Sequence, residues 1–176
     1  MRFDVVEQTK HPRPRVFAAH KDRLLDIAPL LGDVERVELR SRTTHADGRE
    51  EQLHWWTGSP SVLPAIVRPM VPPNLLQWRQ RTLWNRVTWT ADWEIDVPGL
   101  GGSVEASGRN VYLDSDGRCR IEIGGDFAFR PDRVKELSAV PSAVVPMVEK
   151  VVVGLIVPLV QRTGLAVATW LDQGGG

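Results

Sequence analysis

The chain has 176 residues, of which 42% are hydrophobic and 25% are charged. Its 22 acidic and 22 basic side chains balance, and no segment shows the basic excess that is typical of nucleic-acid-binding proteins. This size and composition predict one soluble globular domain over residues 1–173, followed by a glycine tail at 174–176.

The sequence predicts a cytoplasmic protein without a transmembrane segment. Cys119 is the single cysteine, so no intramolecular disulfide can form and a reducing compartment is expected. The N-terminal residues lack the apolar run of a signal peptide. The most apolar stretch, residues 151–160, would be about 15 Å long as a helix, which is half of the ~30 Å core of a bilayer.

The first third of the chain predicts a strand, two short helices and a hairpin. We expect the strand at 2–9, the helices within 11–32, and the hairpin strands at 34–45 and 49–59. Asp47-Gly48 lies between the last two segments and is a strong turn signal.

The register of this first hairpin depends on the length of its loop. A three-residue loop pairs Leu39 with Trp55, whereas a two-residue loop turns Trp56 and His54 inward instead. We prefer the first register because Leu53 and Trp55 then share the apolar face with Leu39.

Residues 60–75 interrupt the strand pattern with five prolines among apolar residues. This density of proline excludes a long regular helix. The segment is too apolar for a solvated linker, so we expect it to pack against the protein as a lid. A rigid loop that fills a gap is the alternative, and fast hydrogen exchange of its amides would indicate the lid.

Strands are expected again at 76–84 and 87–97. The second of these alternates strictly, with Trp89 and Trp93 on its apolar face and acidic residues between them. We expect both tryptophans to line the inner face of a sheet, either as core or as the wall of a ligand site.

The last hairpin, 104–113 with 119–129, has a well-specified register. A two-residue turn at Asp116-Gly117 pairs Tyr112 with Ile121, Asn110 with Ile123, Gly108 with Gly125 and Ala106 with Phe127. A slip of one residue would place charged side chains among isoleucines and phenylalanines. The opposed glycines leave space above the sheet or mark a bend.

Residues 141–172 predict a long helix, with Pro158 as a kink. Its central part is apolar on all sides, and such a helix is buried on all sides. We therefore expect Val153, Val157 and Val160 to be covered, either by residues 60–75 or by a second subunit in a homodimer.

This order of elements resembles the START-like helix-grip superfamily (SRPBCC), which includes lipid-transfer domains, the birch-pollen allergen fold and aromatic polyketide cyclases. The resemblance covers nearly the whole chain, but it rests on topology and pattern. It implies an α+β fold, in which a curved seven-stranded antiparallel sheet grips the long C-terminal helix. It also implies a cavity for a hydrophobic ligand between sheet and helix.

The residues expected to line that cavity are aromatic, apolar or singly polar: Trp55, Trp78, Trp89, Trp93, Asn110, Tyr112, Ile123, Phe127, Val148 and Leu155. Gln80 and Thr82 are further polar candidates. The hydroxyl of Tyr112, the single tyrosine, could orient a ligand carbonyl or form a hydrogen bond within the core.

The sequence shows no metal, cofactor or nucleophile motif. Its four histidines have no metal-ligand spacing, and Cys119 has no sequence partner that would mark a nucleophile. We expect no metal, no cofactor and a buried, inert thiol.

The leading functional prediction is non-catalytic binding or transport of a lipid, isoprenoid or polyketide, with transient membrane contact left open. The alternative is an enzyme similar to polyketide cyclases and dehydratases, with Gln80, Asn110 and Tyr112 as the steering groups and Tyr112 as the proton donor. The third is a protein-interaction module on the apolar helix surface.

Overall fold

The computed structural model of the chain describes residues 2–62, 65, 68–70, 73–130 and 145–175, apart from the side chains of Val62, Met70 and 145–157. Seven strands form one antiparallel sheet in the order β1-β7-β6-β5-β4-β3-β2. They are β1 Arg2–Thr9, β2 Val34–Thr44, β3 Glu50–Gly58, β4 Gln77–Asn85, β5 Thr90–Asp96, β6 Val104–Ser115 and β7 Arg118–Phe129.

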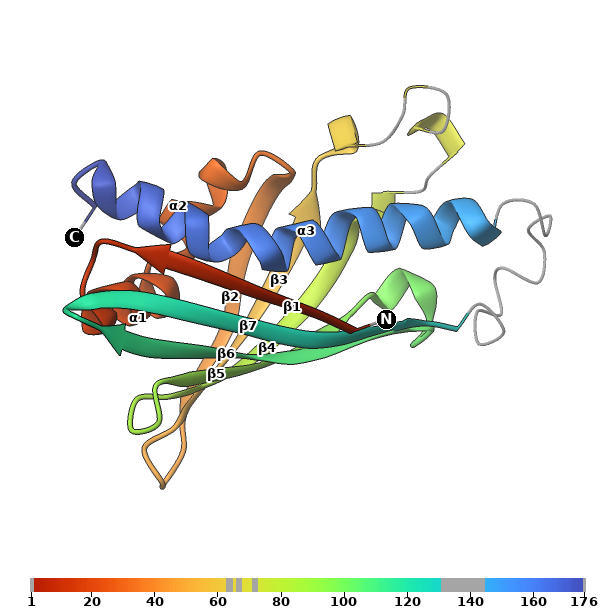
Figure 1. Ribbon diagram of the computed structural model, residues 1–176. Helices are drawn as coiled ribbons and strands as arrows, with labels where there is room; N and C mark the ends of the chain where they lie inside the picture. Colours follow the sequence, from red (N-terminus) through yellow and green to blue (C-terminus); the bar gives the residue numbers. More distant parts are fainter. Residues whose placement is uncertain (1, 63–64, 66–67, 71–72, 131–144, 176) are drawn as a thin grey trace.

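Helices cover one face of this sheet. The long α3 (Val145–Asp172) runs along it, and the short α1 (Arg13–Asp22) and α2 (Leu24–Ile27) follow β1 at one end (Figure 1). The expected α+β architecture, with two short helices after the first strand and a long C-terminal helix on the sheet, is confirmed. The face turned toward α3 is called the inner face below.

Hydrophobic burial explains why α1 lies on the sheet. The helix begins after Pro12 and has a second proline in its first turn, where the missing N–H groups have no helical partner to lose. It buries Val16, Phe17 and His20. The ring of Phe17 meets Tyr112 edge-on at 5.1 Å between centroids, so α1 is anchored on β6.

The predicted register of the β6–β7 hairpin is confirmed at all four predicted pairs, from Tyr112 with Ile121 to Ala106 with Phe127. Asp116 and Gly117 form the turn with φ values of 54° and 76°. Positive φ at both central residues is typical of the type I′ turn, one of the two usual two-residue hairpin turns. Alternation and turn chemistry therefore determine this part of the sheet.

The preferred register of the β2–β3 hairpin is wrong beyond Arg40. Near the turn, Thr44 pairs with Glu50, as a three-residue loop requires, but the register shifts between Leu39 and Ser41. The extra residue is a β-bulge, and a bulge reverses which residues of the strand face inward. Leu39 therefore pairs with His54 rather than with Trp55.

As a consequence, β3 turns its even-numbered side chains inward. Trp56 and His54 are 1% and 2% exposed, whereas Trp55 is only half-buried. The guanidinium of Arg40, the residue at the bulge, lies 5.9 Å from the centre of the Trp55 ring. Trp55 and Leu53 do not belong to the inner face, contrary to expectation.

The strand expected at 87–97 begins only at Thr90. Trp89 lies in the preceding turn with φ of 56°, and its carbonyl accepts a hydrogen bond from the Tyr112 amide at 2.9 Å. Its ring packs edge-on against Phe17 at 5.3 Å and under the guanidinium of Arg13 at 4.4 Å. The described contacts of the Trp89 ring are thus with α1, whereas α3 was expected.

The opposed glycines of β6 and β7 make room for an indole. A Cβ atom at Gly125 would lie 2.7 Å from Trp93 Cη2, and one at Gly108 would clash with Trp93 Cζ2. Phe3 stacks on the same ring with 6.2 Å between centroids. The space above these glycines is therefore filled by Trp93 and is not open to a ligand.

The helix α3 continues through Pro158 without a break. Its described part buries an apolar stripe against sheet and α1: Leu159, Val160, Ala166, Val167 and Leu171. Val160 is 8% exposed, as expected. The predictions for Val153 and Val157 fall on side chains outside the description.

The described residues of 60–76 form three short 3-10 turns, at Pro60–Val62, Arg68–Met70 and Pro73–Leu76. No long helix occurs in the described part of this segment, as its prolines predict. Its role as a lid stays a prediction.

Candidate ligand-binding site

A small, partly open cavity of about 20 Å³ lies between the inner face, α1, α2 and α3. Six polar side chains line it among the described residues: His20, His54, Gln80, Thr82, Asn110 and Thr163. The apolar and aromatic lining consists of Leu24, Trp56, Trp84, Trp93, Leu159 and Val160. A cavity of this size holds about one water molecule or one polar group of a ligand.

Sheet register brings the polar groups together. His54 on β3 pairs directly with Gln80 on β4, and Trp93 on β5 lies beside Asn110, which is on β6 and pairs with Ala91. The two remaining walls are supplied by His20 on α1 and by residues of the C-terminal half of α3. Several elements that are distant in sequence therefore contribute to one small site.

A hydrogen-bond chain runs from the sheet to α1. Trp93 Nε1 donates to Asn110 Oδ1 at 3.0 Å, and Asn110 and Tyr112 are inward-facing neighbours on β6. Tyr112 Oη lies 2.6 Å from His20 Nδ1. All four side chains are at most 6% exposed, so these bonds form away from water.

The cavity is electrically neutral at pH 7. Burial lowers the pKa of His20 to about 4, with a smaller contribution from the nearby His54. Burial also lowers the pKa of His54 to about 4. Burial raises the pKa of Tyr112 above its usual value, against the effect of its hydrogen bond with Asn110. Both imidazoles and the phenol therefore stay uncharged.

Several buried polar atoms of this region lack a partner. Within the described residues, no group hydrogen-bonds to His54 Nδ1, Trp56 Nε1 or Trp84 Nε1. A buried donor or acceptor without a partner destabilises the fold by about 1–3 kcal/mol. Such atoms around a cavity are what a water molecule or a ligand group would satisfy.

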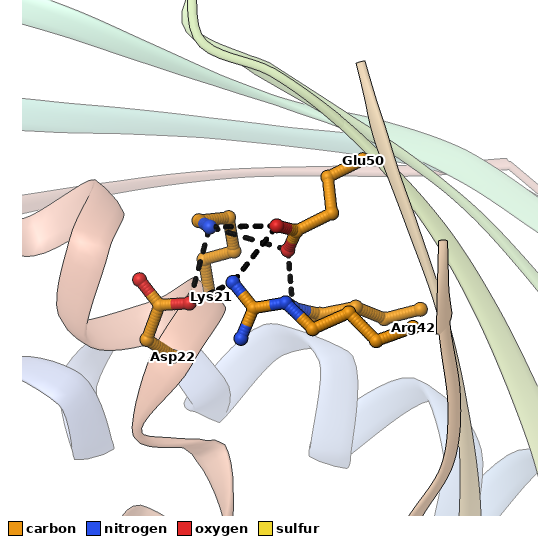
Figure 2. Close-up of polar contacts among 5 residues, drawn as sticks. Lys21, Asp22, Arg42 and Glu50 are labelled. Carbon is orange, nitrogen blue, oxygen red and sulfur yellow. Dashed lines mark hydrogen bonds and ion pairs between the residues drawn. The ribbon is translucent and has the colours of Figure 1, made fainter. Parts of the chain in front are cut away.

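A network of ion pairs holds α1 against the β2–β3 hairpin beside the cavity (Figure 2). Glu50 accepts from Arg42 Nη2 at 2.8 Å and from Lys21 Nζ at 3.2 Å, while Arg42 also donates to Asp22 at 2.8 Å. Glu50 accepts in addition from the buried Gln52 at 2.7 Å. Because Lys21 and Asp22 follow His20 in α1, this network helps to position His20.

Of the residues expected from the sequence, Trp93, Gln80, Thr82 and Asn110 line the cavity. Tyr112 is not among the described lining residues, but its hydroxyl contacts the lining residue His20. The indole of Trp78 stacks on the cavity residue Trp56 at 5.8 Å.

The other expected residues lie elsewhere. Ile123 and Phe127 are buried in the core outside the cavity lining. Trp55 does not belong to the inner face, and Trp89 lies in the turn before β5. Val148 and Leu155 are among the side chains outside the description.

Neither histidine was among the expected site residues, although the two-residue-loop alternative turned His54 inward. His54 would have been found from the even-numbered side chains of 49–59, had the bulge in the neighbouring strand been known. No sequence signal marks His20, because it meets the cavity only when α1 packs on the sheet.

Cys119 is 1% exposed, and burial raises the pKa of its thiol to about 11, so it suits a structural role. In the described part of the chain, no group of three or more histidine, cysteine or acidic residues could hold a metal ion. No helix within the described ranges is both long and apolar enough to cross a bilayer.

Comparison with known proteins gives a fold. No family model and no curated protein matches the sequence. TTHA0849 from Thermus thermophilus aligns with a TM-score of 0.68 and 15% identity over 100% of both chains. The Zhui aromatase/cyclase from a Streptomyces species aligns with 0.60 and 14% over 100% of this chain and 98% of that one.

Norcoclaurine synthase from Thalictrum flavum aligns with a TM-score of 0.57 and 12% identity over 98% of this chain and 87% of that one. The chain has the START-like helix-grip fold. Identities of 12–15% carry no activity from these proteins to this chain.

Proposed function

We propose that this helix-grip protein binds a hydrophobic small molecule, of the lipid, isoprenoid or polyketide class, between the inner face and α3. The observation that carries the proposal is the small cavity beneath α3, which polar side chains and tryptophans line together. An apolar pocket with a few convergent polar groups is the usual form of a small-molecule site. Helix-grip proteins typically bind hydrophobic ligands in a cavity.

The size of the cavity defines how such a ligand would bind. About 20 Å³ accommodates a polar group but not a hydrocarbon body. The apolar body would lie beside the stacked indoles of Trp56 and Trp78, toward the N-terminal half of α3. Binding therefore requires α3 or the segment 60–76 to shift, which is the role proposed for a lid.

Native mass spectrometry of the protein purified from cells, followed by solvent extraction, tests the proposal. We expect a co-purifying hydrophobic molecule that is released by denaturation. We also expect a lipid and polyketide panel to change the tryptophan fluorescence, since four tryptophans lie at or beside the cavity. If no molecule co-purifies and no member of the panel changes the tryptophan fluorescence, the proposal is wrong.

The second candidate function is catalysis of the cyclase or dehydratase type. Its support is the short contact between Tyr112 Oη and His20 Nδ1, and two structural neighbours are named as an aromatase/cyclase and a synthase. Because Tyr112 is enclosed and its pKa is raised, the group that would exchange a proton with a substrate is His20. Recovery of the co-purified molecule unchanged after long incubation would speak for a carrier.

Two further proposals do not concern the cavity. The first is that the protein is located in the cytoplasm. An interaction surface or homodimer contact on residues 151–160 is the other, and the burial of Val160 within the chain removes one residue from that surface.

A further inference from the structure

We propose that the cavity selects ligands by a carbonyl oxygen, which accepts a hydrogen bond from Nε2–H of His20. This inference rests on the proposed function and deepens it, because it names the chemical group of the ligand that the polar side chains of the cavity recognise. It follows from the direction of the hydrogen bonds between Trp93 and His20.

The direction of the chain is set at Trp93. An indole N–H can only donate, so the atom of Asn110 that lies 3.0 Å from Trp93 Nε1 is the carbonyl oxygen. The amide nitrogen of Asn110, which can only donate, is left for its inward-facing neighbour on β6, Tyr112. Any bond that it forms there has the hydroxyl oxygen of Tyr112 as the acceptor.

The same logic fixes the tautomer of His20. Tyr112 is 1% exposed, so its hydroxyl hydrogen needs an acceptor within the protein. Among the described residues, His20 Nδ1 lies 2.6 Å from the hydroxyl oxygen and accepts this hydrogen. A neutral imidazole that accepts at Nδ1 carries its proton at Nε2. His20 lines the cavity, and Nε2 is its ring nitrogen that does not contact Tyr112. Nε2–H is therefore the donor that this side chain offers to the cavity, while the buried Tyr112 holds the ring at Nδ1.

The charge and size of the cavity narrow the acceptor to a carbonyl. No lysine or arginine is among the described residues that line it, and both histidines are neutral at pH 7. A carboxylate or phosphate would lose its water without gaining a countercharge, which is strongly unfavourable. A carbonyl oxygen is uncharged, has the size of the water that about 20 Å³ admits, and can replace that water.

The tautomer is tested first, without any ligand. Nitrogen-15 NMR of the histidine side chains, with His20 assigned by the loss of its signals in His20→Gln, reports which ring nitrogen carries the proton. We expect protonation at Nε2 at pH 7. A proton at Nδ1 of His20 overturns the inference, whatever the protein binds.

The selectivity is tested with three rigid tricyclic probes of one shape: fluorene, 9-fluorenone and 9-fluorenol. We expect the wild-type protein to bind fluorenone about tenfold more tightly than fluorene, the effect of one neutral hydrogen bond. In Tyr112→Phe the hydrogen bond to His20 Nδ1 is lost, so His20 can take the tautomer that accepts at Nε2. Fluorenone should then lose its advantage over fluorene, while fluorenol, which can donate a hydrogen bond, should keep its affinity. Trp55→Phe, on the outer face, is the matched control and should bind like wild type.

Equal affinity for fluorene and fluorenone in the wild-type protein overturns the inference and leaves the proposed function standing. Binding of no probe, together with the absence of any co-purifying molecule, removes the proposed function instead. The two failures are thus distinguishable.

Discussion

The indole of Trp93 lies over the backbone of Gly125, so close that a Cβ atom there would stand 2.7 Å from Cη2 of the ring. The adjacent Gly124 has its open side on the outer face, where a Cβ atom would meet only Asp4 Oδ1 at 3.0 Å. Two neighbouring glycines of one strand therefore differ in function. One accommodates a core ring, and the other faces a flexible side chain.

We predict that Gly125→Ala destabilises the fold by about 1–3 kcal/mol, because an added methyl group forces the packed indole to move. The matched control Gly124→Ala should be neutral or slightly stabilising, since glycine weakens a strand interior. Urea unfolding followed by circular dichroism measures both. Equal effects of the two substitutions would show that Trp93 is not held as the structure has it.

The buried histidines predict a loss of stability in acid. His20 and His54 have pKa values of about 4 in the folded state, against 6.5 for an unperturbed histidine. Between these values the unfolded state binds more protons, so stability is complete above pH 6.5 and falls as the pH drops toward 4. We expect each histidine to contribute on the order of 2 kcal/mol to this loss.

His54→Gln should flatten the pH dependence of the free energy of unfolding between pH 6.5 and 4. The exposed His45 offers the matched control, and His45→Gln should leave the profile unchanged. The prediction is contradicted if the two variants give the same profile.

Glu7 predicts the opposite dependence. Its side chain on β1 faces α3, where a Cβ atom at Gly164 would clash with Glu7 Oε2. Burial raises its pKa to about 7, against a hydrogen bond with the backbone of Leu165 that favours the charged form. For an acid with a raised folded pKa, the folded state binds more protons between pH 4.5 and 7, so stability falls as the pH rises through this window.

Glu7→Gln should therefore stabilise the protein at pH 8, by about 1–2 kcal/mol after allowance for the partial exposure of the carboxylate. The gain should vanish below pH 4.5, where the wild-type carboxyl is protonated in both states. Thermal unfolding at several pH values provides the measurement, and Glu35→Gln, at an exposed position, is the control. A gain that persists at pH 4 would mean that packing, rather than charge, limits this site.

The ion-pair network at Glu50 predicts a role in holding α1. Burial raises the pKa of Glu50, but the hydrogen bonds from Arg42 and Lys21 outweigh this, so the pKa lies below its usual value. Its stabilisation is present above the unfolded pKa and is lost as the pH falls through the folded one. Glu50→Gln leaves Lys21 without its partner on β3, and we expect a loss of about 1–3 kcal/mol at pH 7.

Glu51→Gln is the matched control for this substitution, since Glu51 lies on the outer face, and its salt bridge to Arg81 is exposed. Amide exchange in α1 should accelerate in Glu50→Gln and not in Glu51→Gln. Unchanged exchange in α1 in both variants would contradict the anchoring role.

Much of the fold could be predicted because its signals are local. Alternation in 104–113 and 119–129, with Asp116-Gly117 between them, determined one register completely, since a slip by one residue reverses every side chain. The same local patterns indicated the order of elements, and hence the helix-grip resemblance. They also placed Asn110, Gln80 and Trp93 on the inner face, where the cavity lies.

The tertiary structure alone decided the rest. The bulge at Arg40 changes which side chains of β2 share a face with the even-numbered side chains of β3. The sequence pattern of a strand does not show one inserted residue when polar side chains surround it. Trp89 lies in the turn before β5, yet it fits the alternating pattern of the strand sequence. The pattern therefore does not show where the strand begins. His20 and His54 share a cavity because a helix and a strand from separate parts of the sequence pack together. Side-chain packing between distant segments, rather than periodicity along either one, brings the two histidines into one site.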